Sequence, residues 1–246
     1  MESVGVAVII PTLDEACSIA RVIAELPRPL VRSVIVADGG SRDGTRELAA
    51  AAGARVVVPT GSGYGRACCQ GAAAAAAGIL VFMDGDGADR GDLLAELVEP
   101  IANDRYDFVI ASRTRGRAEP GAMQWHQRLA GLLAGRLIGA LYGFRYSDMC
   151  AFRAIRQDML QRLDMQEMTY GWNIEMQIKA ARRGLRILEL PMPYRRRLGG
   201  KSKVAGSLPG TLRAGTRILA TLLRMMTQPQ PSASGRHRQG DGSSAR

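Results

Sequence analysis

The chain has 246 residues, a formal net charge of +10 and 46% hydrophobic residues, enough apolar material for one large domain that needs no disulfide or metal to fold. Its cysteines, Cys17, Cys68, Cys69 and Cys150, show no CxxC or Cys/His spacing, which argues against a zinc site or a disulfide framework. The first ten residues lack the basic flank of a signal peptide, and no apolar run reaches the roughly 18 residues of a transmembrane helix, so a cytoplasmic protein is expected.

The first 112 residues alternate between short runs rich in Val and Ile and stretches with helical character. Near-continuous hydrophobicity is typical of strands buried on both faces of a parallel sheet, and it predicts strands at 4–10, 33–37, 55–58, 79–83 and 107–111. Helices are predicted from Leu13 to just before Pro27, at 45–52, around 72–77 and at 92–101. This order indicates an α/β domain whose mostly parallel sheet is flanked by helices, with ligands bound outside the carboxyl ends of the strands.

The second half of the chain changes in composition. Residues 118–168 are predicted to be mostly helical, and a loop or flap rich in Pro, Gly and basic residues follows Leu190. We therefore expect a main domain over 1–204, an amphipathic helix within 205–226 and a disordered tail over 227–246.

Carboxylates follow several of the predicted strands. The sharpest case is Asp84-Gly85-Asp86, since Mg²⁺ or Mn²⁺ is usually held by one or two carboxylates together with substrate phosphates. Asp and Gly also form ordinary turns, but the neighbouring acidic loops favour a cation site. An EF-hand is rejected, because Ala95 stands where the loop would need a bidentate Glu.

A glycine-rich loop, residues 61–66, precedes the alanine-rich helix. Such a loop offers backbone N–H groups and a positive helix end to a phosphate, which makes Gly63 and Arg66 candidate ligand-binding residues. The loop matches neither GxGxxG nor a P-loop, and an ordinary helix entry is an equally good interpretation.

The positive charge is concentrated in one segment. Residues 182–224 contain eleven Lys and Arg but a single acidic residue, Glu189. Such a block attracts nucleic acid, anionic lipid or a phosphorylated substrate. Few aromatic residues lie among these charges to stack on bases, so we expect no nucleic-acid partner.

Three ordered motifs, PTLDE at 11–15, VADGGSRDGT at 36–45 and MDGDGAD at 83–89, resemble family 2 glycosyltransferases with the GT-A fold. Residues 148–153, 170–176 and 201–204 are similar to the dolichyl/polyprenyl-phosphate mannose or glucose synthase branch. The resemblance covers roughly residues 4–224. It implies a Rossmann-like nucleotide-sugar-binding half, and the hydrophobic periodicity of this chain adds a C-terminal amphipathic helix.

Carried over by position, the resemblance implies a nucleotide pocket lined by Pro11, Asp14 and Glu15. Asp38 would contact the base edge and Asp84 the ribose.

The same resemblance makes Asp86 the ligand of Mg²⁺ or Mn²⁺. Ala88 stands where the family usually has a second ligand, often Gln, so the neighbouring Asp89 is a candidate for that role only by proximity.

The resemblance further implies an inverting, metal-dependent transfer of a hexose from a UDP- or GDP-sugar to polyprenyl phosphate. A phosphate acceptor is already ionised, so the enzyme would need cations more than a base, and we assign that role to Arg113, Arg115, Arg117, Arg197, Lys201 and Lys203. A hydroxyl acceptor, on a saccharide or small metabolite, would need a base, for which Asp148 is the candidate, although Asp148 fits a bracing role equally well. A non-catalytic nucleotide- or polyanion-binding module is the alternative of another class, and the oligomeric state stays open.

The predicted helix at 212–226 divides into two faces. Arg213, Arg217 and Arg224 fall on one side and mostly apolar residues, Leu219 and Leu222 among them, on the other. This pattern suits either a helix lying on an anionic bilayer or a helix packed on its own domain. The first possibility predicts peripheral attachment to the inner face of the membrane.

Overall fold

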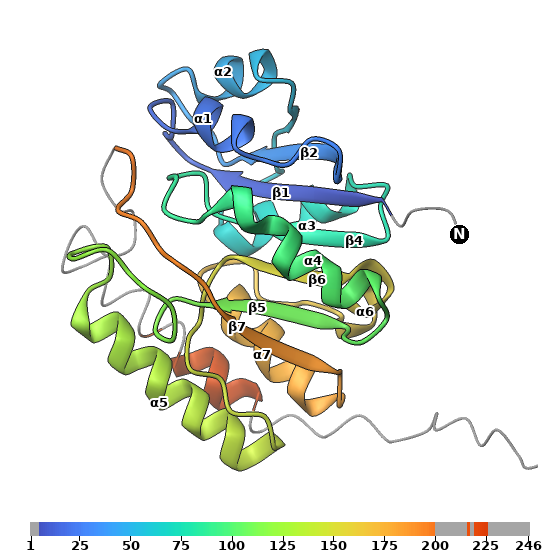
Figure 1. Cartoon of the computed structure of the whole chain (residues 1–246), viewed down its shortest axis with the longest axis vertical. Coiled ribbons are helices and arrows are strands. Elements are labelled where there is room, and N and C mark those ends of the chain that lie inside the picture. The colour runs from blue at the N-terminus through green and yellow to red at the C-terminus, as the bar shows by residue number, and fades with distance from the viewer. Residues whose placement is uncertain (1–4, 200–215, 217–218, 226–246) are drawn as a thin grey trace, which may run out of the picture.

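The computed structural model describes residues 5–199, 216 and 219–225 (Figure 1). Its strands are β1 (Val6–Thr12), β2 (Val31–Asp38), β3 (Arg55–Val57), β4 (Ile79–Phe82), β5 (Phe108–Ser112), β6 (Arg153–Arg156) and β7 (Ile187–Pro191). Its helices are α1 (Ile19–Ala24), α2 (Thr45–Ala51), α3 (Tyr64–Ala73), α4 (Leu94–Ala102), α5 (Trp125–Tyr142), α6 (Gln157–Leu163) and α7 (Trp172–Arg182), and a 3₁₀ turn (Gly91–Leu93) precedes α4.

The strands form a seven-stranded sheet in the order β3-β2-β1-β4-β6-β5-β7. All neighbouring pairs are parallel except those of β6, which runs antiparallel to both β4 and β5. The predicted α/β class and all five predicted strands are confirmed.

The prediction that residues 118–168 are mostly helical is wrong for β6, which lies inside that range. The strand begins with Arg153, whose fully buried guanidinium donates to the carbonyl groups of Ala151 and Asn173 at 3.1 and 3.3 Å. A buried arginine satisfied by backbone carbonyls breaks the apolar pattern by which strands are found in a sequence.

Helix α1 begins at Ile19, so the prediction of a helix from Leu13 is also wrong. Thr12, the expected cap, ends β1 and donates its hydroxyl to Asp38 at 3.2 Å. Asp14 has a left-handed backbone, with φ of 51°. Residues 13–18 are therefore a loop at the carboxyl end of β1, where a ligand can approach it.

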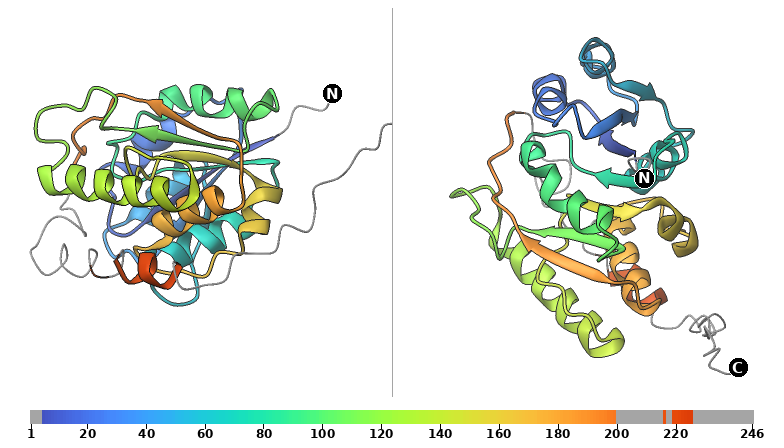
Figure 2. Two further views of the ribbon diagram at one scale, coloured as in Figure 1. Left: turned by 90° about the horizontal axis from the view of Figure 1, so that it is seen from below. Right: turned by 45° about the vertical axis from the view of Figure 1, so that its right-hand side comes forward.

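Helices cover both faces of the sheet (Figure 2). Helix α4 packs against β4, β5 and β6, while α3 packs against β1 and β2 on the opposite face and contacts α7. The core between these layers includes the ring pair Phe82 and Trp172, whose centroids are 6.2 Å apart. This packing fixes the strand ends that carry the motifs.

The described C-terminal residues, 219–225, are helical and pack on the domain. Leu222 is 7% exposed, and the Arg224 guanidinium lies 3.6 Å from the carboxylate of Glu167. Of the two expected alternatives, these contacts support packing on the domain for Leu222 and Arg224, whereas Leu219 and Leu223 of the same helix are 57 and 55% exposed. Arg213 and Arg217 lie outside the described residues.

Candidate active site

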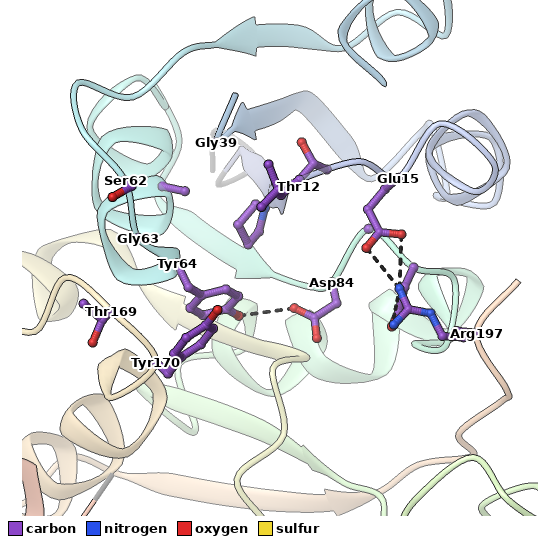
Figure 3. A pocket seen from close by; sticks show the side chains of 15 residues that line it. Thr12, Glu15, Gly39, Ser62, Gly63, Tyr64, Asp84, Thr169, Tyr170 and Arg197 are labelled. Carbon is purple, nitrogen blue, oxygen red and sulfur yellow. Dashed lines mark hydrogen bonds and ion pairs between the residues drawn. The ribbon is translucent and has the colours of Figure 1, made fainter. Parts of the chain in front are cut away.

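A cavity of about 430 Å³ opens at the carboxyl ends of β1 and β4 (Figure 3). Six residues expected from the sequence line it together: Pro11, Glu15, Gly63, Asp84, Asp86 and Arg197. Three further lining residues, Tyr64, Thr169 and Tyr170, were not expected there. The cavity therefore joins the loop after β1, the loop after β4, the start of α3 and the segment after β7.

Asp84 and Asp86 form the acidic side of this cavity. Burial, and after it the charge of Asp86, raises the pKa of Asp84 to about 6, although the Tyr64 hydroxyl donates to the Asp84 carboxylate at 3.3 Å. The raised pKa reflects first the loss of water around the Asp84 carboxylate and then the nearby negative charge of Asp86. A bound cation would balance that charge.

Asp89 lies behind these two carboxylates and does not line the cavity. One of its oxygens accepts a hydrogen bond from the Asp84 N–H at 3.1 Å, and the Cys150 thiol lies 4.0 Å from the other. Burial and the charges of Asp84 and Asp86 raise the pKa of Asp89 to about 8. The geometry gives Asp89 a supporting position under the loop, in place of the expected metal-ligand position.

The segment after β7, residues 192–199, crosses the mouth of the site, and we call it the strap (Figure 1). Its backbone N–H groups donate to the carbonyl groups of Ser112, Arg117, Ala88 and Asp86 at 2.9–3.1 Å. The strap thus covers the carboxyl ends of both β4 and β5. The sequence predicts this segment only as a loop or flap.

Arg197 extends from the strap into the cavity. Its guanidinium donates to the two oxygens of Glu15 at 3.1 and 3.3 Å and lies 3.9 Å from Asp86 (Figure 3). An arginine in this position can form two-pronged contacts with a phosphate that displaces part of this pairing.

Asp38 and Asp14 hold the loops of the cavity together without lining it. The Asp38 carboxylate is fully buried and accepts hydrogen bonds from Thr12, from the Gly40 N–H at 3.0 Å and from the Ser41 N–H at 2.9 Å. Asp14 accepts from the Arg42 N–H at 3.0 Å. In this state both carboxylates connect the β1 loop to the β2 loop.

The glycine-rich loop contributes a wall to the cavity. The N–H groups of Gly65 and Arg66 donate to the carbonyls of Thr169 and Met168 at 3.2 and 3.0 Å, so they are not free to bind a phosphate. A Cβ on Gly63 would overlap the Met168 carbonyl. The Arg66 side chain does not line the cavity, and the expected phosphate role of this loop does not fit its geometry.

Arg113 and Asp148 form a two-pronged ion pair beside the strap. The Asp148 carboxylate accepts from the Arg113 Nε and Nη2 at 2.8 Å each, from the Arg113 N–H at 2.9 Å and from the Met149 N–H at 2.7 Å. Asp148 is 1% exposed. This geometry favours the bracing role over the base.

Two of the remaining expected cations lie at the surface. Arg117 is exposed, and the exposed Arg115 pairs with Glu189 at 3.6 Å. Lys201 and Lys203 lie outside the described residues.

The donors around the cavity fit a divalent cation of the Mg²⁺ or Mn²⁺ type. No cluster of three protein ligands is preassembled among the described residues. Such ions commonly take one or two carboxylates and complete their shell with water and substrate phosphates. Asp86, whose carboxylate lies at the cavity wall, and Asp84 beside it are the residues that would hold the ion.

The aromatic side of the cavity was missed by sequence reasoning. Tyr64 stands inside the glycine-rich loop, in which the sequence pattern points to Gly63 and Arg66 and not to the tyrosine. Tyr170 lines the cavity, whereas Trp172, two residues further on, is buried at 1% exposure. The change of direction at the start of α7 separates these two neighbours.

Comparison with known proteins gives a consistent result. The sequence profile of glycosyl transferase family 2 matches residues 7–164. The chain is 32% identical to glycosyltransferase AglJ of Haloferax volcanii over 77% of its own length, and it spans 63% of that longer protein. It is 33% identical to the dolichyl-phosphate hexose transferase of the same organism, over 78% of this chain and 84% of that protein.

A solved structure of glucosyl-3-phosphoglycerate synthase from Mycobacterium tuberculosis, in complex with Mn²⁺, UDP-glucose and phosphoglyceric acid, matches this fold with a TM-score of 0.73. The identity is 26%, over 92% of this chain and 81% of that chain. The predicted GT-A fold is confirmed.

Proposed function

The chain belongs to glycosyl transferase family 2, and from that premise we propose that it transfers a hexose from a UDP- or GDP-sugar to a polyprenyl phosphate, with inversion and with a divalent cation. That it is a glycosyltransferase follows from the family, so the non-catalytic alternative is set aside. The cavity that brings Asp84, Asp86 and Arg197 together carries the proposal, because it offers carboxylates to a cation and a guanidinium to a phosphate in one space.

The donor end follows from the charges. A leaving nucleoside diphosphate accumulates negative charge as the glycosidic bond breaks, and a divalent cation bound at the carboxylates would neutralise part of it. The rings of Tyr64 and Tyr170 bound the cavity on its apolar side. Asp38 would contact the base only if the base replaces one of the hydrogen bonds that the Asp38 carboxylate accepts in this structure.

The acceptor end favours a phosphate. Both oxygens of Asp148 are occupied by Arg113 and Met149, which leaves the proposed base poorly placed to remove a proton. A phosphate monoester is already ionised at neutral pH and needs no such base. The name of the Haloferax relative, a dolichyl-phosphate hexose transferase, supports the same acceptor class.

A second candidate acceptor is a small phosphorylated metabolite. The structural neighbour was solved with phosphoglyceric acid, and its likeness extends over most of this chain. The two candidates share the phosphate that Arg197 would contact but differ in the attacking atom, which is a phosphate oxygen in one and a hydroxyl in the other.

One experiment separates these acceptors. The purified chain is incubated with radiolabelled UDP- or GDP-hexoses, Mn²⁺ or Mg²⁺, and either a short polyprenyl phosphate or phosphoglyceric acid. We expect the label to enter the organic phase with the lipid. Label appearing only in phosphoglyceric acid would support the second candidate and contradict the first.

Asp86→Asn tests the cation site, and Asp92→Asn is its matched control. Asp92 is paired with Arg90 on the surface, with its side chain 40% exposed, and does not line the cavity. We expect Asp86→Asn to lower transfer at least a hundredfold at an unchanged melting temperature, because metal stabilisation contributes several kcal/mol, and Asp92→Asn to leave it intact. Full activity of Asp86→Asn would contradict the site.

A further inference from the structure

Helix α5 carries its large apolar side chains on the outside of the molecule. Trp125 is 75% exposed, and leucines at successive steps of four residues, Leu129, Leu133, Leu137 and Leu141, are 46, 55, 36 and 42% exposed. A row at this spacing runs along the helix at a shallow angle to its axis. Helices of globular proteins normally turn such a stripe toward the core.

The inner face of α5 explains this inversion. Its buried residues are Gly131, Ala134, Gly135 and Ile138, and a Cβ on Gly135 would overlap the Tyr146 carbonyl, while one on Gly131 would lie 3.5 Å from the Cα of Asp148. The helix therefore sits so close to Tyr146 at Gly135 that no side chain fits at that point of its inner face. The exposed position of the leucines is built into this packing.

The charge around this row has one sign. Residues 120–147 contain no Asp or Glu but include Arg128, Arg136 and Arg145, all exposed. Arginine side chains flanking an apolar helix face can extend to lipid headgroups while the apolar groups enter the bilayer interface. Tryptophan is also enriched at that depth.

We propose that the outer face of α5 is the surface by which this enzyme binds an anionic phospholipid bilayer. The charge complementarity selects this occupant, since a second copy of the same face would bring like charges together. The proposal rests on the proposed function only in that a lipid-borne acceptor requires access to a bilayer. It moves the membrane contact from the predicted C-terminal helix to α5.

The position of α5 suits that task. Figure 1 shows the helix along the margin of the molecule beside β7, with its N-terminal end on the side where the strands end. Its inner face touches the loop of Asp148, which is paired with Arg113. A bilayer on the outer face would lie about one helix diameter, roughly 10 Å, from that pair.

Vesicle binding tests the surface with a matched pair of variants. Leu129→Gln/Leu133→Gln removes two leucines that are 46 and 55% exposed, and Leu48→Gln/Val58→Gln removes two apolar side chains elsewhere that are 41 and 56% exposed. Vesicles contain phosphatidylglycerol and phosphatidylcholine, or phosphatidylcholine alone, without polyprenyl phosphate or donor. We expect wild type and the control to sediment with the anionic vesicles, and the α5 variant to bind them at least tenfold more weakly.

A second measurement uses the unmodified chain and so does not depend on how a variant folds. The protein has two tryptophans, and Trp172 is 1% exposed in the core, so acyl-brominated phosphatidylglycerol should quench Trp125 selectively. Absence of quenching, or equal binding by the two double variants, would overturn the proposal. So would a lipid-free dimer that only the α5 variant loses. Vesicle binding without sugar transfer would leave this surface standing and count against the proposed function alone.

Discussion

Replacing Asp148 by Asn tests whether the Asp148 carboxylate stabilises the fold through its ion pair with Arg113 or acts as a general base. The carboxylate is 1% exposed and its partner Arg113 is 17% exposed at the side chain, so the variant leaves a largely buried guanidinium without its counter-charge. Breaking a buried pair in this way costs about 3–5 kcal/mol. In a chain of this size, where 1 kcal/mol shifts the melting temperature by about 2–4 °C, we expect a fall of roughly 6–20 °C.

The assay combines thermal unfolding with a pH–rate profile. A brace predicts the lower melting temperature together with an unchanged shape of the profile in the folded variant. The double variant Arg113→Met/Asp148→Leu should recover part of the lost stability, because it removes both charges. A melting temperature within 2 °C or so of wild type, with transfer reduced a thousandfold and the acid limb of the profile lost, would refute the reasoning.

Three further predictions concern the strap and α5. Arg197→Ala should raise the KM for the acceptor at least tenfold and change the nucleotide affinity, measured by calorimetry, less than threefold. Arg196→Ala, at the adjacent exposed arginine, is the control. Equal losses of acceptor and nucleotide affinity would place Arg197 at the donor instead. Gly131→Ala should stabilise the folded protein by about 0.5–1 kcal/mol, as in most helices. Gly135→Ala should destabilise it by about 1–3 kcal/mol, because the new Cβ would overlap the Tyr146 carbonyl. Urea unfolding that ranks the two variants the other way would disprove the close packing. The hydrogen bond from Arg195 holds the pKa of Glu25 below its ordinary value of 4.5, so this pair stabilises the fold above that pH and its contribution disappears as the pH falls through the lowered pKa. The difference in unfolding midpoint between wild type and Arg195→Met should therefore shrink from pH 7 to about pH 3, and a constant difference would mean that the charge of Glu25 plays no part.

The strand ends were predictable because two signals agree there. A buried parallel strand is continuously apolar, and the loop after it carries the polar residues of the site, so the sequence alone predicts that Glu15, Asp84 and Asp86 lie at one rim of the sheet. Arg197 was assigned from charge and resemblance. The position of the strap, residues 192–199, over that rim is not predictable from helical or strand periodicity. It depends on backbone hydrogen bonds to the carbonyl groups of Ser112, Arg117, Ala88 and Asp86.

The remaining errors have a common physical cause. A polar side chain that forms its hydrogen bonds with residues far along the chain is mistaken, from the sequence, for an exposed residue or for a helix cap. Thr12 resembles a helix cap but bonds to Asp38 on the neighbouring strand. Arg153 resembles a surface residue but donates to buried carbonyls. In each case the deciding partner lies far along the chain or depends on tertiary packing.

The late position of β6 has a consequence for how the chain is made. Residues 153–156 fill the gap between β4 and β5, which precede them by about 70 and 40 residues, so a nascent chain that ends before Arg153 holds two strands with nothing between them. Unpaired strand edges template association with other chains, and pairings between distant segments form slowly. Ribosome-bound or truncated chains shorter than about 156 residues should therefore depend on chaperones, and that dependence should fall when Arg153–Arg156 emerges and joins β4 to β5.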